Sequence, residues 1–505
     1  MLPHVRIASA LKEAKKAAHD HVIRTRDISR ETREILSHTK WLREIIKGYY
    51  LLTNPSAQDH ETTVWQGVYW NFLALYLDDR FGKNYVLSPE NSLDIQTRNT
   101  TLPVQIMLQS TTGGQGITQF PHGCSLFNYC VSKPSMPSFV ETHEGIRIFP
   151  LELALVKTGP AFFEKNRENA HIALRLADVQ KLSRHILEGD ASVVAVERIY
   201  QGLLQVKRTA EAERLRMTLK AVGIILSKKK NVIESTLKIP RSISPYAERI
   251  KLLWHDMREM VVKALPKSPG IHGGKAKILK SIEATYTHDA YHSLSIEGYK
   301  VSEELIEKVR AGAWDLSSSD DHDQLDAMAA KGYFEAFHAV KESIETVLDG
   351  GNVATVFEND LSIWFTALFS PSVQAGLLKA SDLAGYRNKP VFIRGSHHVP
   401  PPSAALMDCM EALFECLNNE PHAGVQAILG HFIFTFIHPF PDGNGRIGRF
   451  LMNMMLVSGG YPWTIIRSDR EHRTNYLEAL EEASVQRKIA RFCQFVAKEM
   501  TVDWK

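Results

Sequence analysis

Apolar residues in the C-terminal half of the chain recur at the three- and four-residue spacing of amphipathic helices. The stretch His422–Ile437 is apolar on nearly every side, so we expect a buried central helix there, with His431 as a core histidine rather than a ligand. The apolar residues of Phe450–Met455 predict another helix just after residue 445. Further helices are expected over residues 303–311, 323–348, 359–369, 403–418 and 470–484.

The N-terminal half has a different pattern. Residues 1–69 are predicted to be largely helical, and the short strand Gly48–Leu52 makes them compatible with a winged helix-turn-helix. Residues 70–240 mix short strand-like runs with helices, and residues 241–275 are expected to connect this α/β region to residues 276–505. The predicted fold class is therefore mainly α, with a mixed α/β region ahead of a helical core.

Composition narrows the class of protein. The chain has 505 residues, 44% of them hydrophobic and 23% charged, with a net charge of +3, so it is an ordinary globular protein without a global signal for polyanions. No apolar run approaches the length of a membrane span, and the first residues lack the core of a signal peptide, so we expect a cytoplasmic protein without membrane contact. The five cysteines form no close pair and predict neither disulfides nor a zinc site.

The run His438–Arg449 carries the chemistry. Two glycines, Gly443 and Gly445, can bring backbone N–H groups close to an anion, and a helix that begins beside them adds its N-terminal dipole. Arg446 and Arg449 lie three apart, so both project from one helical face with guanidinium forks suited to phosphate. Asp442 supplies a hard oxygen ligand for Mg²⁺, and His438 titrates in the range of a general base.

This run resembles the signature of Fic (filamentation induced by cAMP) proteins, His-Pro-Phe-x-Asp/Glu-Gly-Asn-Gly-Arg-x-x-Arg, at every defined position. The resemblance implies an all-helical Fic core that transfers AMP from ATP to a Ser, Thr or Tyr hydroxyl of a target protein. It makes His438 the base and Asp442 the ligand of Mg²⁺ on the phosphates. The residues implied to contact the nucleotide are Asp442, Gly443, Asn444, Gly445, Arg446, Ile447, Gly448 and Arg449, with Tyr476 on the adenine side.

Two further segments are similar to the same family. Val391, Phe392, Ile393 and Arg394 resemble its flap, a β-hairpin on which the target protein docks by strand addition. Ser293, Glu297 and Gly298 match its inhibitory motif Ser/Thr-x-x-x-Glu-Gly/Asn on a helix expected over residues 281–298. About 0.4 such matches arise by chance in a chain of this length. The inhibitory interpretation therefore depends on the position of this match, just before the core. Gly298 also suits a plain helix end.

The sequence therefore predicts a Mg²⁺-dependent protein adenylyltransferase that is held inactive by Glu297. Two alternatives stay open: removal of AMP from a modified protein at the same site, and a DNA-binding regulator whose Fic core senses ATP. DNA would bind residues 1–69, because residues 1–60 contain eleven Lys and Arg but only seven Asp and Glu. A basic solvated surface is nevertheless the preferred interpretation of this charge. The N-terminal half faintly resembles the regulators of abortive-infection antitoxins. A homo-oligomer is neither predicted nor excluded.

Overall fold

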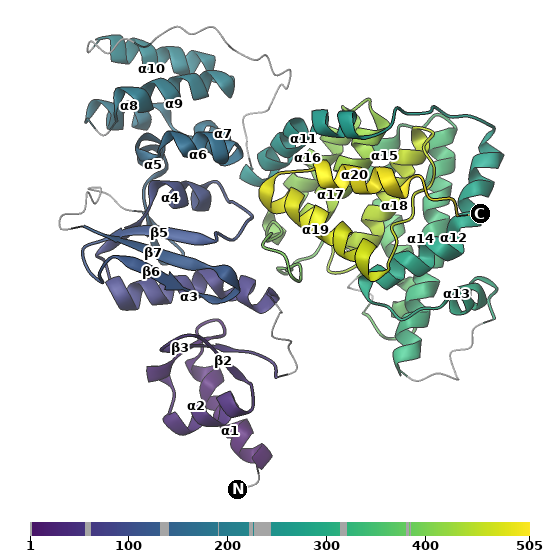
Figure 1. Ribbon diagram of the computed structural model, residues 1–505, viewed down its shortest axis with the longest axis horizontal. Coiled ribbons are helices and arrows are strands. Elements are labelled where there is room, and N and C mark those ends of the chain that lie inside the picture. The colour runs from purple at the N-terminus through teal and green to yellow at the C-terminus, as the bar shows by residue number, and fades with distance from the viewer. Residues whose placement is uncertain are drawn as a thin grey trace. The chain divides into compact units, whose positions relative to one another are not determined.

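The computed structural model describes residues 3–55, 62–131, 141–189, 191–221, 226, 244–313, 321–379, 383 and 385–504. It divides into two compact units (Figure 1). The first, here called the N-terminal unit, is Met1–Pro245 together with Phe392–Val399. The second, the helical unit, is Tyr246–Val391 together with Pro400–Lys505. No helix among the described residues is both long and apolar enough to cross a membrane.

Residues 3–52 form a small α/β subdomain. Its elements are α1 (Pro3–Ala17), β1 (Val22–Arg24), α2 (Arg30–His38), β2 (Leu42–Ile46) and β3 (Tyr49–Leu52), with antiparallel strands in the order β1-β3-β2. The expectation of a largely helical segment is wrong for β1 and β2. In β2 a register shift between Glu44 and Ile46 buries both Leu42 and Ile45, which gives a strand the three-residue spacing of a helix.

The next subdomain places a helix against a four-stranded sheet. It comprises α3 (Thr63–Phe81), β4 (Tyr85–Leu87), α4 (Pro89–Gln96), β5 (Gln105–Ser110), β6 (Gly116–Gln119) and β7 (Ser125–Cys130). The strand order is β4-β5-β7-β6, with β5 and β7 parallel. Aromatic residues of α3, Phe72 among them, form one core with Ile106 and Leu126 of the sheet. A hairpin of β8 (Glu141–His143) and β9 (Ile146–Ile148) follows, so the mixed α/β character expected here is present.

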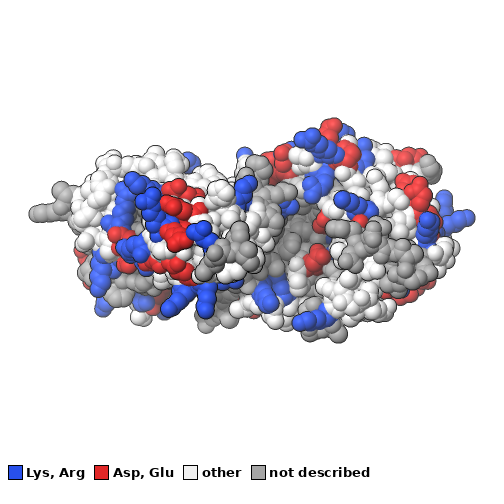
Figure 2. Space-filling view, turned by 90° about the horizontal axis from the view of Figure 1, so that it is seen from below, with Lys and Arg blue, Asp and Glu red and all other residues white. Residues whose placement is uncertain are grey.

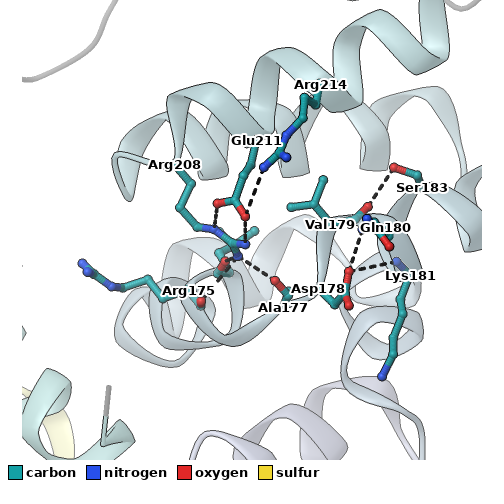
Figure 3. A network of polar contacts seen from close by, with 11 residues as sticks. Arg175, Ala177, Asp178, Val179, Gln180, Lys181, Ser183, Arg208, Glu211 and Arg214 are labelled. Atoms are coloured by element: carbon teal, nitrogen blue, oxygen red, sulfur yellow. Dashed lines mark hydrogen bonds and ion pairs between the residues drawn. The ribbon is translucent and has the colours of Figure 1, made fainter. Parts of the chain in front are cut away.

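Short helices complete the N-terminal unit: α5 (Leu151–Lys157), α6 (Pro160–Lys165), α7 (Arg167–Leu176), α8 (Val179–Leu187), α9 (Val193–Gln205) and α10 (Thr209–Ala221). The helices α7 and α8 are separate, because Asp178 caps α8 by accepting from the backbone N–H of Gln180 at 2.7 Å. Arg208 closes the other side of the break (Figure 3). It donates to the carbonyls of Leu174 and Ala177, each at 2.7 Å, and pairs with Glu211.

The helical unit contains α11 (Pro245–Ala264), α12 (Lys275–Glu297), α13 (Glu303–Arg310), α14 (Asp321–Leu348), α15 (Val353–Gln374), α16 (Leu406–Asn418), α17 (Ala423–Ile437), α18 (Asn444–Ser458), α19 (Arg470–Gln486) and α20 (Ala490–Glu499). Nearly every residue of α17 is buried, which confirms the predicted central helix. The adjacent α18 is buried almost throughout as well, and it begins beside the C-terminus of α17. These two helix ends frame the run His438–Arg449.

The β-hairpin expected over Val391–Arg394 is not formed, so this prediction is wrong. Val391–Ile393 have no regular secondary structure, and Arg394 begins a turn. The described part of this loop contains only an isolated bridge, between His398 and Thr101. Prolines before and after the loop restrict strand formation there, since proline lacks the N–H that a ladder needs.

Candidate active site

The catalytic histidine predicted from sequence sits at the C-terminal cap of α17. His438 has left-handed backbone angles, φ 53° and ψ 59°, and its N–H bonds to the carbonyl of Phe434 at 2.9 Å. Arg387 fixes the turn that follows: its Nε donates to the His438 carbonyl at 2.8 Å, and its N–H donates to the Pro439 carbonyl at 2.9 Å. The backbone that presents the imidazole is therefore held from outside the helix.

The protonation of His438 suits a base. Its Nδ1 lies 3.2 Å from the carbonyl oxygen of Thr435, and a carbonyl can only accept, so the proton belongs on Nδ1. Nε2 is then left with a lone pair. Burial lowers the pKa of His438, against the opposing effect of the Thr435 carbonyl, so the ring is neutral at pH 7. A neutral imidazole with a free Nε2 is able to take a proton from a hydroxyl.

Glycines shape the start of α18. Gly443 is its N-cap residue with φ 82°, a conformation that side chains disfavour, and a Cβ there would lie 2.8 Å from the ring of Phe369. Asn444 holds the turn through its side-chain amide, which accepts from the Phe440 N–H at 2.9 Å and donates to the Phe440 carbonyl at 2.8 Å. Its side chain is therefore occupied, and Asn444 can offer an anion only its N–H at the helix N-terminus.

Arg446 is buried to 1% exposure between two rings. Its guanidinium carbon lies 5.1 Å from the ring centroid of Tyr299 and 5.0 Å from that of Phe369. One nitrogen donates to Asp442 Oδ2 at 3.2 Å, while the buried Nε has no hydrogen-bond partner among the described residues. A buried cationic group with an unused donor suits an anionic ligand such as a phosphate.

Arg449 is held by two residues of α12. Its Nε donates to Ser293 Oγ at 2.9 Å, and its terminal nitrogen donates to the Ser293 carbonyl at 3.0 Å and to Glu297 Oε1 at 2.7 Å. Glu297 of the predicted inhibitory motif thus contacts Arg449 of the run His438–Arg449. Burial alone would raise the pKa of Glu297, but the charges of Arg449 and Arg446 outweigh this effect. The pKa is therefore lowered overall, and the carboxylate is charged. The helix ends as expected at Gly298, which has φ 96°.

The residues around Asp442 fit a nucleotide-bound Mg²⁺. The Asp442 side chain is 62% exposed, and its Oδ1 accepts from the Gly443 N–H at 2.5 Å. The described residues contain no cluster of three His, Cys, Asp or Glu side chains that would hold a metal alone. Mg²⁺ on a nucleotide needs only one or two protein carboxylates besides phosphate oxygens and water. One exposed carboxylate beside a cationic helix terminus meets that requirement.

Comparison with known proteins agrees with the motif. Residues 369–456 match the profile of the Fic/DOC family. The chain carries a Fic/DOC domain. A relative from Nematostella vectensis, named protein adenylyltransferase Fic, is 28% identical over 261 residues, which are 50% of this chain and 57% of that protein. A probable protein adenylyltransferase from Aquifex aeolicus is 38% identical over 101 residues, 20% of this chain and 30% of that protein.

Among solved structures, Fic-1 from C. elegans matches with a TM-score of 0.37 and 18% sequence identity, over 69% of this chain and 94% of that one. The chain spans 57% and 44% of the length of two curated relatives, the second from Culex quinquefasciatus. The names of both contain the activity, protein adenylyltransferase.

Three residues predicted to contact nucleotide are packed within the helical unit. Tyr476 is 2% exposed, and its hydroxyl bonds to His431 Nε2 at 2.8 Å. Ile447 is fully buried, and a Cβ on Gly448 would lie 2.9 Å from His431 Nδ1, so Gly448 permits close packing of α17 and α18. His431 is fully buried in α17, which confirms a core histidine, and burial lowers its pKa to about 4.

The sequence did not identify a buried polar pair near the contact of Glu297 with Arg449. The Tyr333 hydroxyl on α14 donates to Asp289 Oδ2 at 2.7 Å, and both side chains are buried. Asp289 is one turn before Ser293 on α12, so this pair fixes the face of the helix that reaches Arg449. Burial raises the pKa of Asp289 to about 6 despite the Tyr333 hydrogen bond. The one signal for Asp289 in the sequence is its spacing of four and eight residues from Ser293 and Glu297, which places all three on one helical face.

Proposed function

We propose that this chain is a protein adenylyltransferase that transfers AMP from ATP to a hydroxyl of a target protein. One observation carries the proposal: a neutral histidine, a glycine-lined helix N-terminus and two buried arginines meet where α17 ends and α18 begins. The adenylyltransferase named among the relatives supports it. Positioning and charge stabilisation account for most catalysis in phosphoryl-type transfer, and this arrangement supplies both.

The reaction assigns one step to each group. The target hydroxyl oxygen attacks the α-phosphorus of ATP, and its proton passes to Nε2 of His438. A new oxygen–phosphorus bond forms while the bond from the α-phosphorus to the bridging oxygen breaks, and pyrophosphate leaves. Arg446 and Arg449 bind the outer phosphates, and the N–H groups at the start of α18 bind the oxygens nearest the α-phosphorus. Mg²⁺, held by Asp442, would neutralise charge on the phosphates.

Glu297 is proposed to hold this activity off. Its Oε1 lies 2.7 Å from the nitrogen of Arg449 that a terminal phosphate would use. A carboxylate and a phosphate oxygen compete for the same guanidinium group, and the carboxylate is supplied within the chain. ATP that enters against this competitor is misplaced, and a shift of about 1 Å can cost roughly 10²-fold in rate.

The direct test uses ATP labelled on the α-phosphate with wild-type protein, Glu297→Gly and the double variant Glu297→Gly/His438→Ala. We expect Glu297→Gly to transfer label to itself or to added cell proteins at least about tenfold faster than wild type, and the double variant to lose that gain. Mass spectrometry then identifies the labelled residue. Labelling that is equal in all three proteins contradicts the proposal.

The same variants address removal of AMP as an alternative. Protein labelled by Glu297→Gly is freed of ATP and incubated with wild-type chain. If wild type releases AMP and Glu297→Gly does not, Glu297 aligns an attacking water, and hydrolysis is the activity of the wild-type site. Stable label under both conditions leaves transfer as the activity.

One observation favours nucleic-acid binding as a second function. The strand order β1-β3-β2, with α2 before the hairpin of β2 and β3, is that of a winged helix-turn-helix. Lys47 is exposed at the tip of the hairpin. The surrounding charges are mixed, since Arg6 pairs with Glu31 and Arg30 with Glu34. Figure 2 likewise shows Lys and Arg interspersed with Asp and Glu on the face it presents.

The test measures binding of the full chain to duplex DNA at 50 and 200 mM salt with wild type, Lys47→Glu and the matched control Lys83→Glu. Lys83 is exposed in the loop after α3 and lies outside the winged subdomain. We expect Lys47→Glu alone to weaken binding and to reduce its salt dependence. Equal effects of the two variants, or no binding at low salt, contradict this second function.

A further inference from the structure

The loop that follows Arg387 is already paired along its main chain. The Leu102 N–H donates to the His397 carbonyl at 3.0 Å, and the Val399 N–H donates to the Thr100 carbonyl at 2.6 Å. These two bonds flank an antiparallel bridge between Thr101 and His398. The segment Thr100–Leu102, which precedes β5 in the N-terminal unit, thus acts as a short partner strand for residues 397–399.

Side chains of α3 and of the residue before it reinforce this pairing. The Gly395 N–H donates to Thr62 Oγ1 at 3.0 Å, and the amide of Gln66 donates to the Ser396 carbonyl. The ring of Phe392 rests against Gly67, where a Cβ would lie 3.3 Å from it. Gln66 is 4% exposed, so these bonds lie in a closely packed contact. Residues 395–399 of the loop therefore all contact other residues of the N-terminal unit.

Both ends of the same loop are tied to the backbone around the catalytic base. Besides its bond to the His438 carbonyl, Arg387 donates to the Pro401 carbonyl at 2.5 Å. Arg387 is 4% exposed, and burial lowers its pKa to about 10, which leaves it charged at pH 7.

A peptide that adds to a strand needs free N–H and C=O groups on alternate residues. Between Gly395 and Val399, four such groups are bonded to other residues of the N-terminal unit. We propose that His397–Val399 is a strand-pairing surface for an extended segment of the target protein, and that Thr100–Leu102 occupy it as an internal substitute. A target gains this surface only by displacing them. The inference rests on the proposed transfer of AMP to a protein.

A reversible cross-link tests the displacement. Thr101 and His398 form the non-hydrogen-bonded type of antiparallel pair, whose Cα atoms lie within the range that a disulfide spans. The variant Thr101→Cys/His398→Cys is made with Glu297→Gly, so that transfer is measurable. We expect the oxidised protein to label added targets at least about tenfold more slowly than the reduced protein, because the tether raises the local concentration of the internal strand. Single-cysteine variants under the same oxidant are the controls.

The outcomes separate the two proposals. Equal labelling by the oxidised and reduced forms, or failure of the folded double variant to cross-link, overturns the strand-pairing inference while transfer by the reduced form upholds the function. Absence of labelling in every form, together with Glu297→Gly alone, overturns the function itself. ATP binding should be unchanged by oxidation, which distinguishes a blocked target surface from a distorted nucleotide site.

A second variant tests the same surface without a cross-link. Gln66→Ala removes the amide that bonds to the Ser396 carbonyl, so we expect labelling of added targets to rise about fivefold, the effect of one hydrogen bond. The matched control is Gln105→Ala, an exposed glutamine of β5 in the same unit. A fall in labelling with Gln66→Ala, or equal rises in both variants, contradicts the inference.

Discussion

The carboxylate of Glu297 occupies the space where a side chain on residue 445 would stand, so a Cβ built on Gly445 collides with Oε1. The absence of a side chain at this position thus allows two things at once. It lets a carboxylate of α12 reach the first turn of α18, and it leaves the same backbone open to a phosphate when the carboxylate withdraws. Inhibitor and substrate are proposed to use one space in turn.

This sharing predicts that Gly445→Ala does not activate the enzyme. The added methyl displaces Glu297, but it also stands where the phosphates approach. We expect Gly445→Ala to be inactive, and in the Glu297→Gly background to weaken ATP binding about tenfold, measured by calorimetry. Unchanged ATP affinity in the double variant would show that the backbone at Gly445 does not contact the nucleotide.

Ser293 is expected to contribute less to inhibition than Glu297. Ser293→Ala removes the hydroxyl that accepts from Arg449 Nε, but the Ser293 carbonyl and Glu297 still bind the guanidinium group. We predict activation of labelling by about fivefold, as for one hydrogen bond, and less than with Glu297→Gly. Ser295→Ala, on the same helix, is the control and should match wild type. Activation equal to that of Glu297→Gly would assign the main restraint to the serine.

His438→Ala and Asp442→Ala should fail in different ways. Loss of the base is expected to lower turnover in the Glu297→Gly background by about 10²–10⁴-fold while ATP binding persists. Loss of the exposed carboxylate should remove the dependence of ATP binding on Mg²⁺ as well as turnover. Titrations of ATP with and without Mg²⁺ measure the difference. Retention of the Mg²⁺ effect in Asp442→Ala would place the metal on other ligands.

The buried pair of Asp289 and Tyr333 predicts a pH dependence of stability. The pKa of Asp289 is raised from 3.8 to about 6, so the folded protein binds more protons than the unfolded chain between these values. The protonated Asp289 therefore contributes its whole stabilisation of the folded state below about pH 4, and this stabilisation is lost as the pH rises towards 6. A shift of about two units corresponds to roughly 3 kcal/mol as an upper bound.

Denaturation of Asp289→Asn and wild type at pH 4 and pH 8 measures this contribution. The variant lacks the titrating group, so its stability relative to wild type should improve by about 1–3 kcal/mol between the two pH values. A difference between the two proteins that is independent of pH would mean that Asp289 titrates normally in the folded state.

Local chemistry was more predictable than packing. The run His438–Arg449 could be interpreted because each residue type has a distinct role at short spacing, whereas the contact of Glu297 with Arg449 joins two segments far apart in the sequence. The role of Arg387 could not be predicted, because its bonds to the backbone near His438 join segments about fifty residues apart. The burial of Tyr476 was not predicted, because an aromatic side chain on a helix has the same signature in a core and in a binding site.

The N-terminal elements show a second limit. Leu42 and Ile45 have the spacing of one helical face, yet they lie in a strand whose register shifts between them. A bulge inserts a residue into the period of two, and pattern alone cannot distinguish the result from a helix. The missing hairpin at Val391–Arg394 has another cause, since prolines flank the loop and its later residues, 397–399, pair with Thr100–Leu102.

The chain enters the helical unit at Tyr246, leaves it for the eight residues Phe392–Val399, and returns at Pro400. A single cut at residue 245 therefore does not yield two complete pieces. The fragment from residue 246 onward would keep these eight residues but lose every hydrogen-bond donor and acceptor that the N-terminal unit supplies to them. The activity of such a fragment would therefore be measured with residues 392–399 stripped of the hydrogen bonds that they make in the intact chain.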